Sequence, residues 1–413
     1  MSFLDAALAA RLRRLSRIPV RAVGILYHEG LSGIYARLRY PKPFWRRRQP
    51  MIPLSGPVLI EGGTPRCQAQ IAKALRDVEL SVTFHADDPY ACRILIDPAL
   101  SQGRSVTTQD LLVLVSDEPQ NAVALGPSAR KALALLATRT ETLLQLQKSG
   151  VPQQKLFAVK DADSLHEGMI RYLVAAGNSA PDRVDWRAFS ELRAPLPHRL
   201  GLSLPETVAR RHSFLSTAPD GFGVFGGLRY QPGWVGAAAS YRLMASAYLD
   251  QEHSPVLLCE DDIEFSPRFT SRLRIIEDYL SRCDWDVFSG LLTNVTEGYR
   301  ITRVTRHDGE VFVHLNRCVG MVCNVYNHGG LTRLASWRVE TGMTIDRYLE
   351  QTPGLKVVTT VPFLANHRDN LSSSVWGFDN RRYRSMIQAS EKRLMQMVEE
   401  HDASRRDSHD QPR

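Results

Sequence analysis

The first half of the chain alternates short apolar runs with longer stretches of helical periodicity. The apolar runs predict strands at residues 57–61, 80–84, 93–96, 111–115, 122–125 and 132–137. Helical spacing of apolar positions predicts helices at 68–76, 141–149 and 164–176. This succession predicts an open, Rossmann-like α/β domain with parallel strands over residues 55–177. We expect it to be a packing domain; the alternative, a phosphate cradle at Gly62-Gly63-Thr64, lacks the established glycine motifs.

The second half begins after a proline-rich, polar stretch at residues 178–197, where we place a domain boundary. An apolar strand at 199–204 leads into a helix that opens near Pro205 and carries Arg210. A further helix runs from Gly233 to Tyr248, and apolar strands follow at 256–259, 317–326 and 357–361. The pattern predicts a second α/β domain over 197–378 and a C-terminal helix over 379–400. Residues 401–413 have almost no apolar content and are expected to be disordered.

Composition limits the class of protein. A chain of 413 residues with 43% hydrophobic content suits two globular domains plus tails. The sequence has no apolar run of about 18 residues that would cross a membrane, and no apolar region typical of a secretory signal. The six cysteines form no CxxC pair. We therefore expect free thiols, Cys318 and Cys323 among them, and a cytoplasmic location.

The positive charge is concentrated in residues 1–48. The whole chain carries +8, whereas residues 1–48 hold eleven basic and two acidic residues, so the remainder carries about −1. Apolar and aromatic positions are interleaved with these arginines, which predicts a basic amphipathic arm over 1–50. We expect the arm to contact an anionic membrane surface, on the inner face of the cell membrane. Docking on the body of the protein is the alternative; nucleic acid is not expected, because the folded part is not basic.

Candidate chemistry appears where the strand at 256–259 ends in Glu260, Asp261 and Asp262. Adjacent carboxylates at the end of a buried strand repel one another, and each costs several kcal/mol to desolvate unless it is paired or binds metal. A divalent cation would resolve this, and oxygen ligands favour Mg²⁺ or Mn²⁺. The alternative is a solvated acidic turn.

Several motifs of the second half occur in a recognisable order. They are Leu202-Ser203-Leu204 with Arg210, then Gly233-Trp234-Val235-Gly236 with Ser240 and Tyr241, then Cys259-Glu260-Asp261-Asp262, Trp285-Asp286, Ile345-Asp346 and Pro362-Phe363. This order resembles glycosyltransferase family 25, the group of lipopolysaccharide-modifying and procollagen galactosyltransferases, over the C-terminal half of the chain only. The Ser149-Gly150-Val151-Pro152 turn also resembles a turn of Rossmann-like glycosyltransferases. The chain departs from the family pattern at Ser203, Ala237 and Tyr241, the last of which replaces a histidine.

The resemblance implies a GT-A type fold with a mixed sheet. It implies transfer of a hexose, galactose-like, from a nucleoside-diphosphate sugar to a glycan or lipid-linked acceptor in surface polysaccharide synthesis, with Mn²⁺ or Mg²⁺. Our candidate metal ligands are Asp262, then Asp261, and His367, which has a structural role as its alternative. The candidates for binding the donor are Arg210, Gly236, Ser240, Tyr241 and Glu260.

Two aspartates are candidates for the base that deprotonates the acceptor hydroxyl. Asp346 is the first, with a helix first-turn role as its alternative, and Asp369 is the reserve. The rival hypotheses for the whole protein are a non-catalytic relative that binds nucleotide sugar or glycan, and a membrane-attached scaffold.

Overall fold

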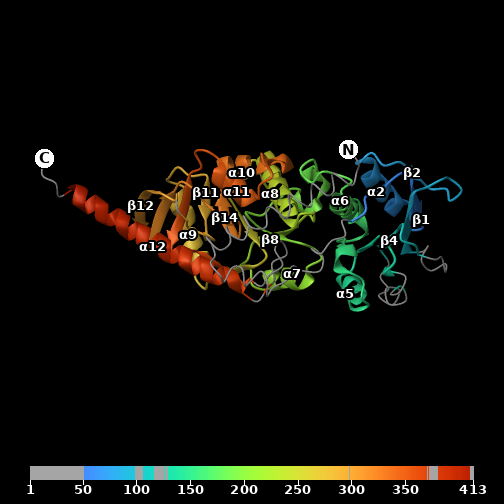
Figure 1. Cartoon of the computed structure of the whole chain (residues 1–413), viewed down its shortest axis with the longest axis horizontal. Helices are drawn as coiled ribbons and strands as arrows, with labels where there is room; N and C mark the ends of the chain where they lie inside the picture. Colours follow the sequence, from blue (N-terminus) through green and yellow to red (C-terminus); the bar gives the residue numbers. More distant parts are fainter. Residues whose placement is uncertain are drawn as a thin grey trace, which may run out of the picture.

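The computed structural model describes residues 51–97, 106–115, 125, 129–296, 298–369, 371 and 380–409. The predicted basic arm lies outside the described residues, as do positions 122–124 of one predicted strand. Two sheets follow one another along the long axis of the molecule, and a long C-terminal helix runs beside the second (Figure 1). The fold is therefore mixed α/β in both halves, as predicted.

The first sheet is entirely parallel and has the order β2-β1-β3-β4-β5-β6. Its strands are β1 (Val58–Glu61), β2 (Val82–Thr83), β3 (Cys92–Ile96), β4 (Asp110–Leu114), β5 (Ala134–Ala137) and β6 (Leu156–Ala158). The helices are α2 (Pro65–Arg76), α5 (Thr140–Lys148) and α6 (Leu165–Ala176). Alternate side chains of β3, β4 and β5 pack against α2 and α6 on one face and against α5 on the other. Burial on both faces explains why these strands are apolar apart from the paired Arg93 and Asp110 near their starts.

The second sheet is mixed and has the order β12-β13-β15-β11-β14-β9-β7-β8. Its strands are β7 (Arg199–Ser203), β8 (Phe222–Gly226), β9 (Val256–Glu260), β11 (Val287–Ser289), β12 (Ile301–His307), β13 (Glu310–Leu315), β14 (Cys323–Tyr326) and β15 (Val357–Val361). All of these run in one direction except β13 and β14, which are antiparallel to their neighbours. The predicted strand at 317–326 is thus confirmed only for its last four residues.

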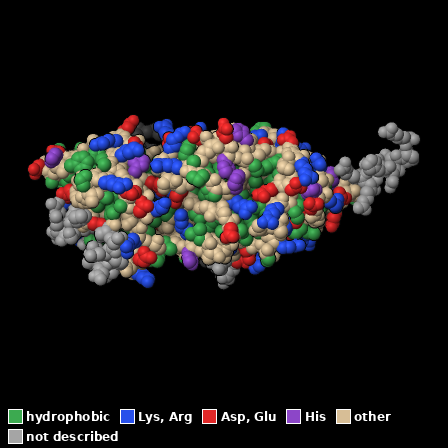
Figure 2. Space-filling view, turned by 180° about the vertical axis from the view of Figure 1, so that it is seen from behind, with side chains coloured by type: hydrophobic (Ala, Val, Ile, Leu, Met, Phe, Trp, Pro, Cys, Tyr) green, Lys and Arg blue, Asp and Glu red, His purple; other side chains and the backbone are tan. Residues whose placement is uncertain are grey.

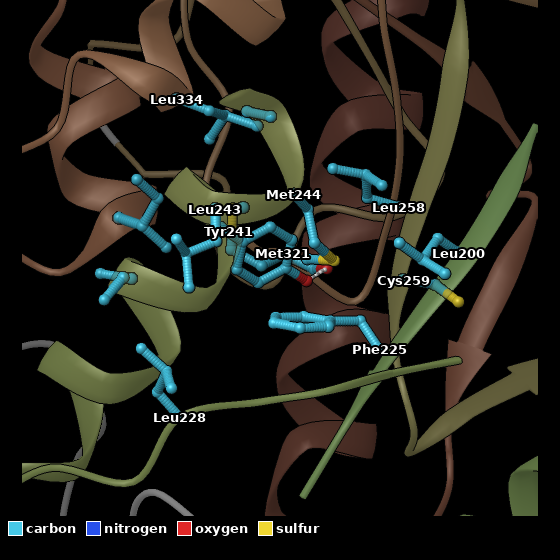
Figure 3. Packing of buried hydrophobic residues seen from close by; sticks show 14 of the residues in the cluster. Leu200, Phe225, Leu228, Tyr241, Leu243, Met244, Leu258, Cys259, Met321 and Leu334 are labelled. Carbon is cyan, nitrogen blue, oxygen red and sulfur yellow. Dashed lines mark hydrogen bonds between the residues drawn. The ribbon is translucent and has the colours of Figure 1, made fainter. Parts of the chain in front are cut away.

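The helices of this half are α7 (Val208–Leu215), α8 (Gly233–Asp250), α9 (Phe269–Leu280), α10 (His328–Ala335) and α11 (Ile345–Gln351). A separate two-stranded sheet pairs β10 (Ile263–Phe265) with β16 (Ala365–His367). The core lies between α8 and the large sheet, where Tyr241 and Met244 pack near Phe225 and Leu258 (Figure 3).

The C-terminal helix α12 (Arg381–His409) contacts β12, β15 and β16 (Figure 1). It continues past the predicted end at 400, so the expectation of disorder is wrong for residues 401–409. Composition misled here because a polar stretch can extend an existing helix once the preceding turns are anchored. Ile387, Leu394 and Val398 are buried, and Arg306 pairs with Asp402 at 2.6 Å.

The structure also bears on the cysteines, on membrane-spanning helices and on the distribution of charge. All six cysteines lie in the described part of the chain and are free thiols, five of them buried, as predicted. Within that part, none of the helices combines the length and apolar character needed to cross a bilayer. Figure 2 shows basic and acidic side chains interspersed over one face of the molecule, which agrees with the near-zero charge outside the N-terminal arm.

Candidate functional site

The acidic cluster lies at the carboxyl end of β9, beside the carboxyl end of the parallel strand β7. From β7 the chain continues through α7 to β8 on one side, whereas from β9 it continues through β10 and α9 to β11 on the other side. Neighbouring strands with connections that leave in opposite directions form a topological switch point. In open α/β sheets, ligands bind in the crevice at such a point, outside the carboxyl ends of the strands.

Arg210 connects the two aspartates of the cluster. Its guanidinium donates from Nε to Asp261 Oδ1 at 3.0 Å and from Nη2 both to Asp261 and to Asp262 Oδ2, the latter at 2.9 Å. The Ser203 hydroxyl donates to Asp261 Oδ2 at 2.7 Å. Asp261 and Asp262 are 5% and 4% exposed, so this guanidinium offsets much of the cost of burying two negative charges side by side.

A second grouping extends from Asp262 in the other direction. One ligand atom from each of Glu260, Asp262 and His367 lies within 4.8 Å of the others. The separation between His367 Nε2 and Asp262 Oδ2 is 3.5 Å. The short sheet explains this proximity, because Ile263 pairs with His367 across β10 and β16, and the Arg368 amide donates to the Asp262 carbonyl at 2.8 Å.

Asn380 completes the cluster from the residue before α12. It is fully buried, and its Nδ2 donates to Asp262 Oδ2 at 3.2 Å. The ring of Tyr383, one turn later, lies 4.8 Å from the ring of His367, measured between centroids. The sequence analysis missed Asn380 and Tyr383, because neither lies near the acidic strand in the chain and no local pattern marks them.

Three polar atoms of this cluster are buried without a hydrogen-bond partner among the described residues. They are Asp262 Oδ1, His367 Nδ1 and Asn380 Oδ1. An unpaired buried polar atom costs about 1–3 kcal/mol, and a bound ion or ordered water is a common partner for such atoms.

The two carboxylates grouped with His367, those of Glu260 and Asp262, have pKa values shifted in opposite directions. Burial raises the pKa of Glu260 to about 8, and the negative charge of Asp262 adds to this effect. Burial also opposes ionisation of Asp262, but the charges of His367 and Arg210 lower its pKa below the usual range. Asp262 is therefore the charged member of the group, and Glu260 gains a proton readily when no cation is bound.

The structure changes the predicted ligand set in one place. Asp262 and His367 come together as expected, whereas Asp261 contacts Ser203 and Arg210, and Glu260 lies within ligand-like distance of Asp262 and His367. Strand β9 ends at Glu260, and Asp261 and Asp262 form the turn that leads into β10, so their side-chain directions are set by this turn.

Three of the predicted donor-binding residues have packing roles instead. The Ser240 hydroxyl accepts from the Leu228 amide at 2.8 Å and donates to the Gly236 carbonyl at 2.7 Å. A Cβ added at Gly236 would lie 2.5 Å from the Leu228 carbonyl oxygen, so glycine lets α8 approach this segment. Tyr241 is fully buried and its hydroxyl donates to the Met321 carbonyl at 2.8 Å (Figure 3). The hydroxyl groups of Ser240 and Tyr241 are thus buried and engaged by the protein's own backbone.

The two candidate bases differ in what they contact. Asp346 lies in the first turn of α11, and its Oδ1 accepts from the Thr344 hydroxyl and from the Arg347 amide. Its charge nevertheless contributes to the raised pKa of Glu260. Asp369 lies two residues after His367; its Oδ2 accepts from Arg384 at 2.7 Å, and its buried Oδ1 has no partner among the described residues.

Asp278, His307 and Asp308 form another group with ligand-like spacing. Both aspartates are exposed, and Asp278 already pairs with Arg282 at 2.6 Å and with His307 at 2.9 Å. These contacts account for the group as an ordinary surface ion-pair network.

In comparisons with known proteins, no family model matches the chain and no curated protein matches it at a significant level.

Proposed function

We propose that this protein is a metal-dependent glycosyltransferase. It would move a hexose, galactose-like, from a nucleoside-diphosphate sugar to a glycan or lipid-linked acceptor in surface polysaccharide synthesis. The observation that carries the proposal is the group of partly buried Glu260 with buried Asp262 and His367 at a topological switch point, with the Asp262 Oδ1 unpaired among the described residues. The family resemblance over the C-terminal half supports it, and we take the large mixed sheet, with β14 reversed between β9 and β11, as a GT-A type arrangement.

The donor set fits a divalent cation. Two carboxylates favour Mg²⁺ or Mn²⁺, and an imidazole is better tolerated by Mn²⁺ than by Mg²⁺. The unpaired Asp262 Oδ1 offers a ligand atom that Arg210 does not occupy. We assign Glu260, Asp262 and His367 as the ligands, and we keep Asp261 as the residue that holds Arg210 in place.

The other residues of the site provide charge and proton transfer. When bound, the cation would neutralise the charge that develops on the departing diphosphate. Arg210, held by Asp261 beside the same site, would supply a second positive charge to the diphosphate. For deprotonation of the acceptor hydroxyl, we propose Asp369 ahead of Asp346, because Asp369, two residues after His367 in the chain, keeps one oxygen without a partner among the described residues.

The test uses the full-length chain and a matched aspartate variant. Wild-type protein is screened with UDP-, GDP- and CMP-sugars plus Mn²⁺ by thermal shift and by product formation. Asp262→Asn should abolish Mn²⁺ binding, measured by calorimetry, and reduce transfer at least about 100-fold. Asp278→Asn, in the exposed surface group, should preserve both. Unchanged Mn²⁺ binding by Asp262→Asn would refute the ligand assignment.

A second candidate function is a non-catalytic nucleotide-sugar or glycan-binding protein. The observation that favours it is the contact network of Arg210, which already compensates Asp261 and Asp262 without a metal. Mn²⁺-dependent transfer or hydrolysis of any nucleotide sugar would exclude this alternative. Binding without turnover across the same screen would favour it.

We also propose that residues 1–48 hold the protein on the cytoplasmic face of an anionic membrane, near its acceptor, as their composition suggests. Co-sedimentation with mixed phosphatidylglycerol–phosphatidylcholine vesicles, compared with vesicles of phosphatidylcholine alone, tests this contact. Equal binding to both types of vesicle would contradict an electrostatic attachment. Sedimentation with neither would favour docking of the arm on the body of the protein.

A further inference from the structure

The two sheets are joined at an edge strand. β6 is the last strand of the parallel sheet, and among the described strands it pairs with β5 alone. In a parallel strand, alternate residues direct their amide and carbonyl groups to opposite sides. The outward groups of β6 include the Leu156 carbonyl and the Ala158 amide, and an unpaired edge of this kind must be satisfied or covered.

Two side chains from the second half bind these outward groups. Glu206 Oε1 accepts from the Ala158 amide at 3.3 Å, and Arg229 Nη2 donates to the Leu156 carbonyl at 2.7 Å. The arginine also donates from Nη1 to the Gln153 carbonyl at 3.3 Å, and its guanidinium lies 3.8 Å from the centre of the Phe157 ring. The two side chains thus bind backbone groups that a neighbouring strand would otherwise bind.

The same two side chains are linked to each other. Arg229 Nε and Glu206 Oε2 are 3.9 Å apart, with 20% and 4% of their side chains exposed. Gln153 Nε2 also donates to the Glu206 carbonyl at 3.4 Å. The acid and the arginine therefore act as one unit against β6, and removing one member would leave the other buried and poorly compensated.

The positions of these residues in the chain connect the edge to the candidate site. Glu206 lies between Ser203, which donates to Asp261, and Arg210, which pairs with Asp261 and Asp262. Arg229 follows β8, one residue after Leu228, whose amide donates to Ser240 of α8. The segments fixed on β6 are thus the two loops at the carboxyl ends of β7 and β8.

We propose that Glu206 and Arg229 are positioning residues through which the parallel sheet fixes the start of α7, and with it Arg210, against the acidic pair. The first half of the chain then contributes directly to the geometry of the site. The inference concerns the placement of Arg210 and stands apart from the reaction; only its effect on donor binding rests on the proposed function.

The primary test is hydrogen exchange of the full-length chain, read by mass spectrometry on peptides covering residues 204–216. Arg229→Met keeps an unbranched apolar side chain at this position and removes the guanidinium, with its contacts to β6, Phe157 and Glu206. We expect exchange in 204–216 to rise about tenfold, as expected when a charged hydrogen-bonded contact is lost, with little change in α10 and β13. Unchanged exchange at 204–216 in folded Arg229→Met would overturn the proposal.

The matched control is Arg333→Met. Arg333 also donates to two carbonyls, those of Pro353 and Gly354, and to one carboxylate, that of Asp286, but it lies on α10. It should raise exchange locally and leave 204–216 unchanged. If both variants raise exchange at 204–216 equally, the effect is general destabilisation and the proposal is wrong.

Two milder variants protect the test against a failure to fold. Glu206→Gln keeps an acceptor for Ala158 and removes only the charge opposite Arg229, so we expect about a threefold rise at 204–216. Arg229→Lys should restore part of the protection lost in Arg229→Met, because it keeps the charge without the fork geometry. No rise with Glu206→Gln together with no rescue by the lysine would refute a positioning role.

A kinetic readout separates this inference from the proposed function. If the wild type transfers sugar, Arg229→Met should raise the KM for the donor about tenfold and change kcat less than twofold, because Arg210 is displaced without being removed. An unchanged KM would contradict the coupling to the site. If the wild type transfers no sugar while 204–216 still loosens in Arg229→Met, the proposed function fails and the positioning role holds.

Discussion

Replacing Arg210 by methionine gives the sharpest test of how the acidic cluster is stabilised. The substitution keeps most of the apolar stem and removes the charge that contacts Asp261 and Asp262, both of which are buried. Breaking a buried ion pair by removing one partner costs about 3–5 kcal/mol. At about 2–4 °C per kcal/mol for a domain of this size, the melting temperature should fall by roughly 10 °C.

A cation bound at the cluster should reverse part of this loss. Mn²⁺ would restore positive charge beside Asp262, and a ligand at 100 times its Kd stabilises the folded state by about 2.7 kcal/mol. We expect saturating Mn²⁺ to raise the melting temperature of Arg210→Met more than that of the wild type. The assay is thermal unfolding followed by circular dichroism, with and without Mn²⁺, at pH 7.

The control is Arg282→Met, which breaks the exposed pair between Arg282 and Asp278. Exposed pairs contribute about 0–1 kcal/mol, so this variant should melt within a few degrees of the wild type. If Arg210→Met is no less stable than Arg282→Met, the reasoning about buried charge is wrong. An equal response of wild type and Arg210→Met to Mn²⁺ would refute the link between the guanidinium and the cation.

Three further predictions concern the site and its frame. The pKa of Glu260 is raised to about 8, so without metal this residue contributes stability that is present at pH 4.5 and is lost as the pH rises toward 8. In urea titrations, Glu260→Gln should flatten that decline in the free energy of unfolding, and an unaltered decline would contradict the shift. Gly236→Ala places a methyl group 2.5 Å from the Leu228 carbonyl and should cost about 1–3 kcal/mol in the same titrations, whereas no loss would show that α8 can move away. Leu394→Ala, on the buried face of α12, should lower the free energy of unfolding by about 2–5 kcal/mol, whereas Met395→Ala, at a half-exposed position, should lower it by under about 1 kcal/mol. Equal losses would mean that this face does not anchor the helix.

Local pattern was a good guide to the elements themselves. Those apolar runs of the first half that the structure describes in full became parallel strands close to the predicted bounds, because strands covered on both faces must be apolar throughout. The acidic cluster at the end of β9 was also visible in the sequence, since charge directly after a buried strand is unusual. The Rossmann-like rhythm and the free cysteines followed from composition and spacing in the same way.

The sequence did not show which groups the predicted site residues contact in the fold. Asp261 was placed on the metal, whereas its contacts are with Ser203 and Arg210. Gly236, Ser240 and Tyr241 were placed in a donor pocket, whereas they pack α8 against the segment after β8 and the large sheet. A small residue in a helix permits close approach, but the sequence does not say whether a ligand or the protein's own backbone approaches.

The sequence by itself determined the periodicity of the strands and helices, the concentration of positive charge in residues 1–48, and the acidic end of one inner strand. These depend on neighbours within a few positions, where steric and hydrophobic preferences act directly. Only the tertiary structure brought His367 and Asn380 to Asp262 from distant parts of the chain, and placed Glu206 and Arg229 on the edge of β6. Such contacts arise from the order of strands and the crossing of helices, and those depend on the packing of the whole chain.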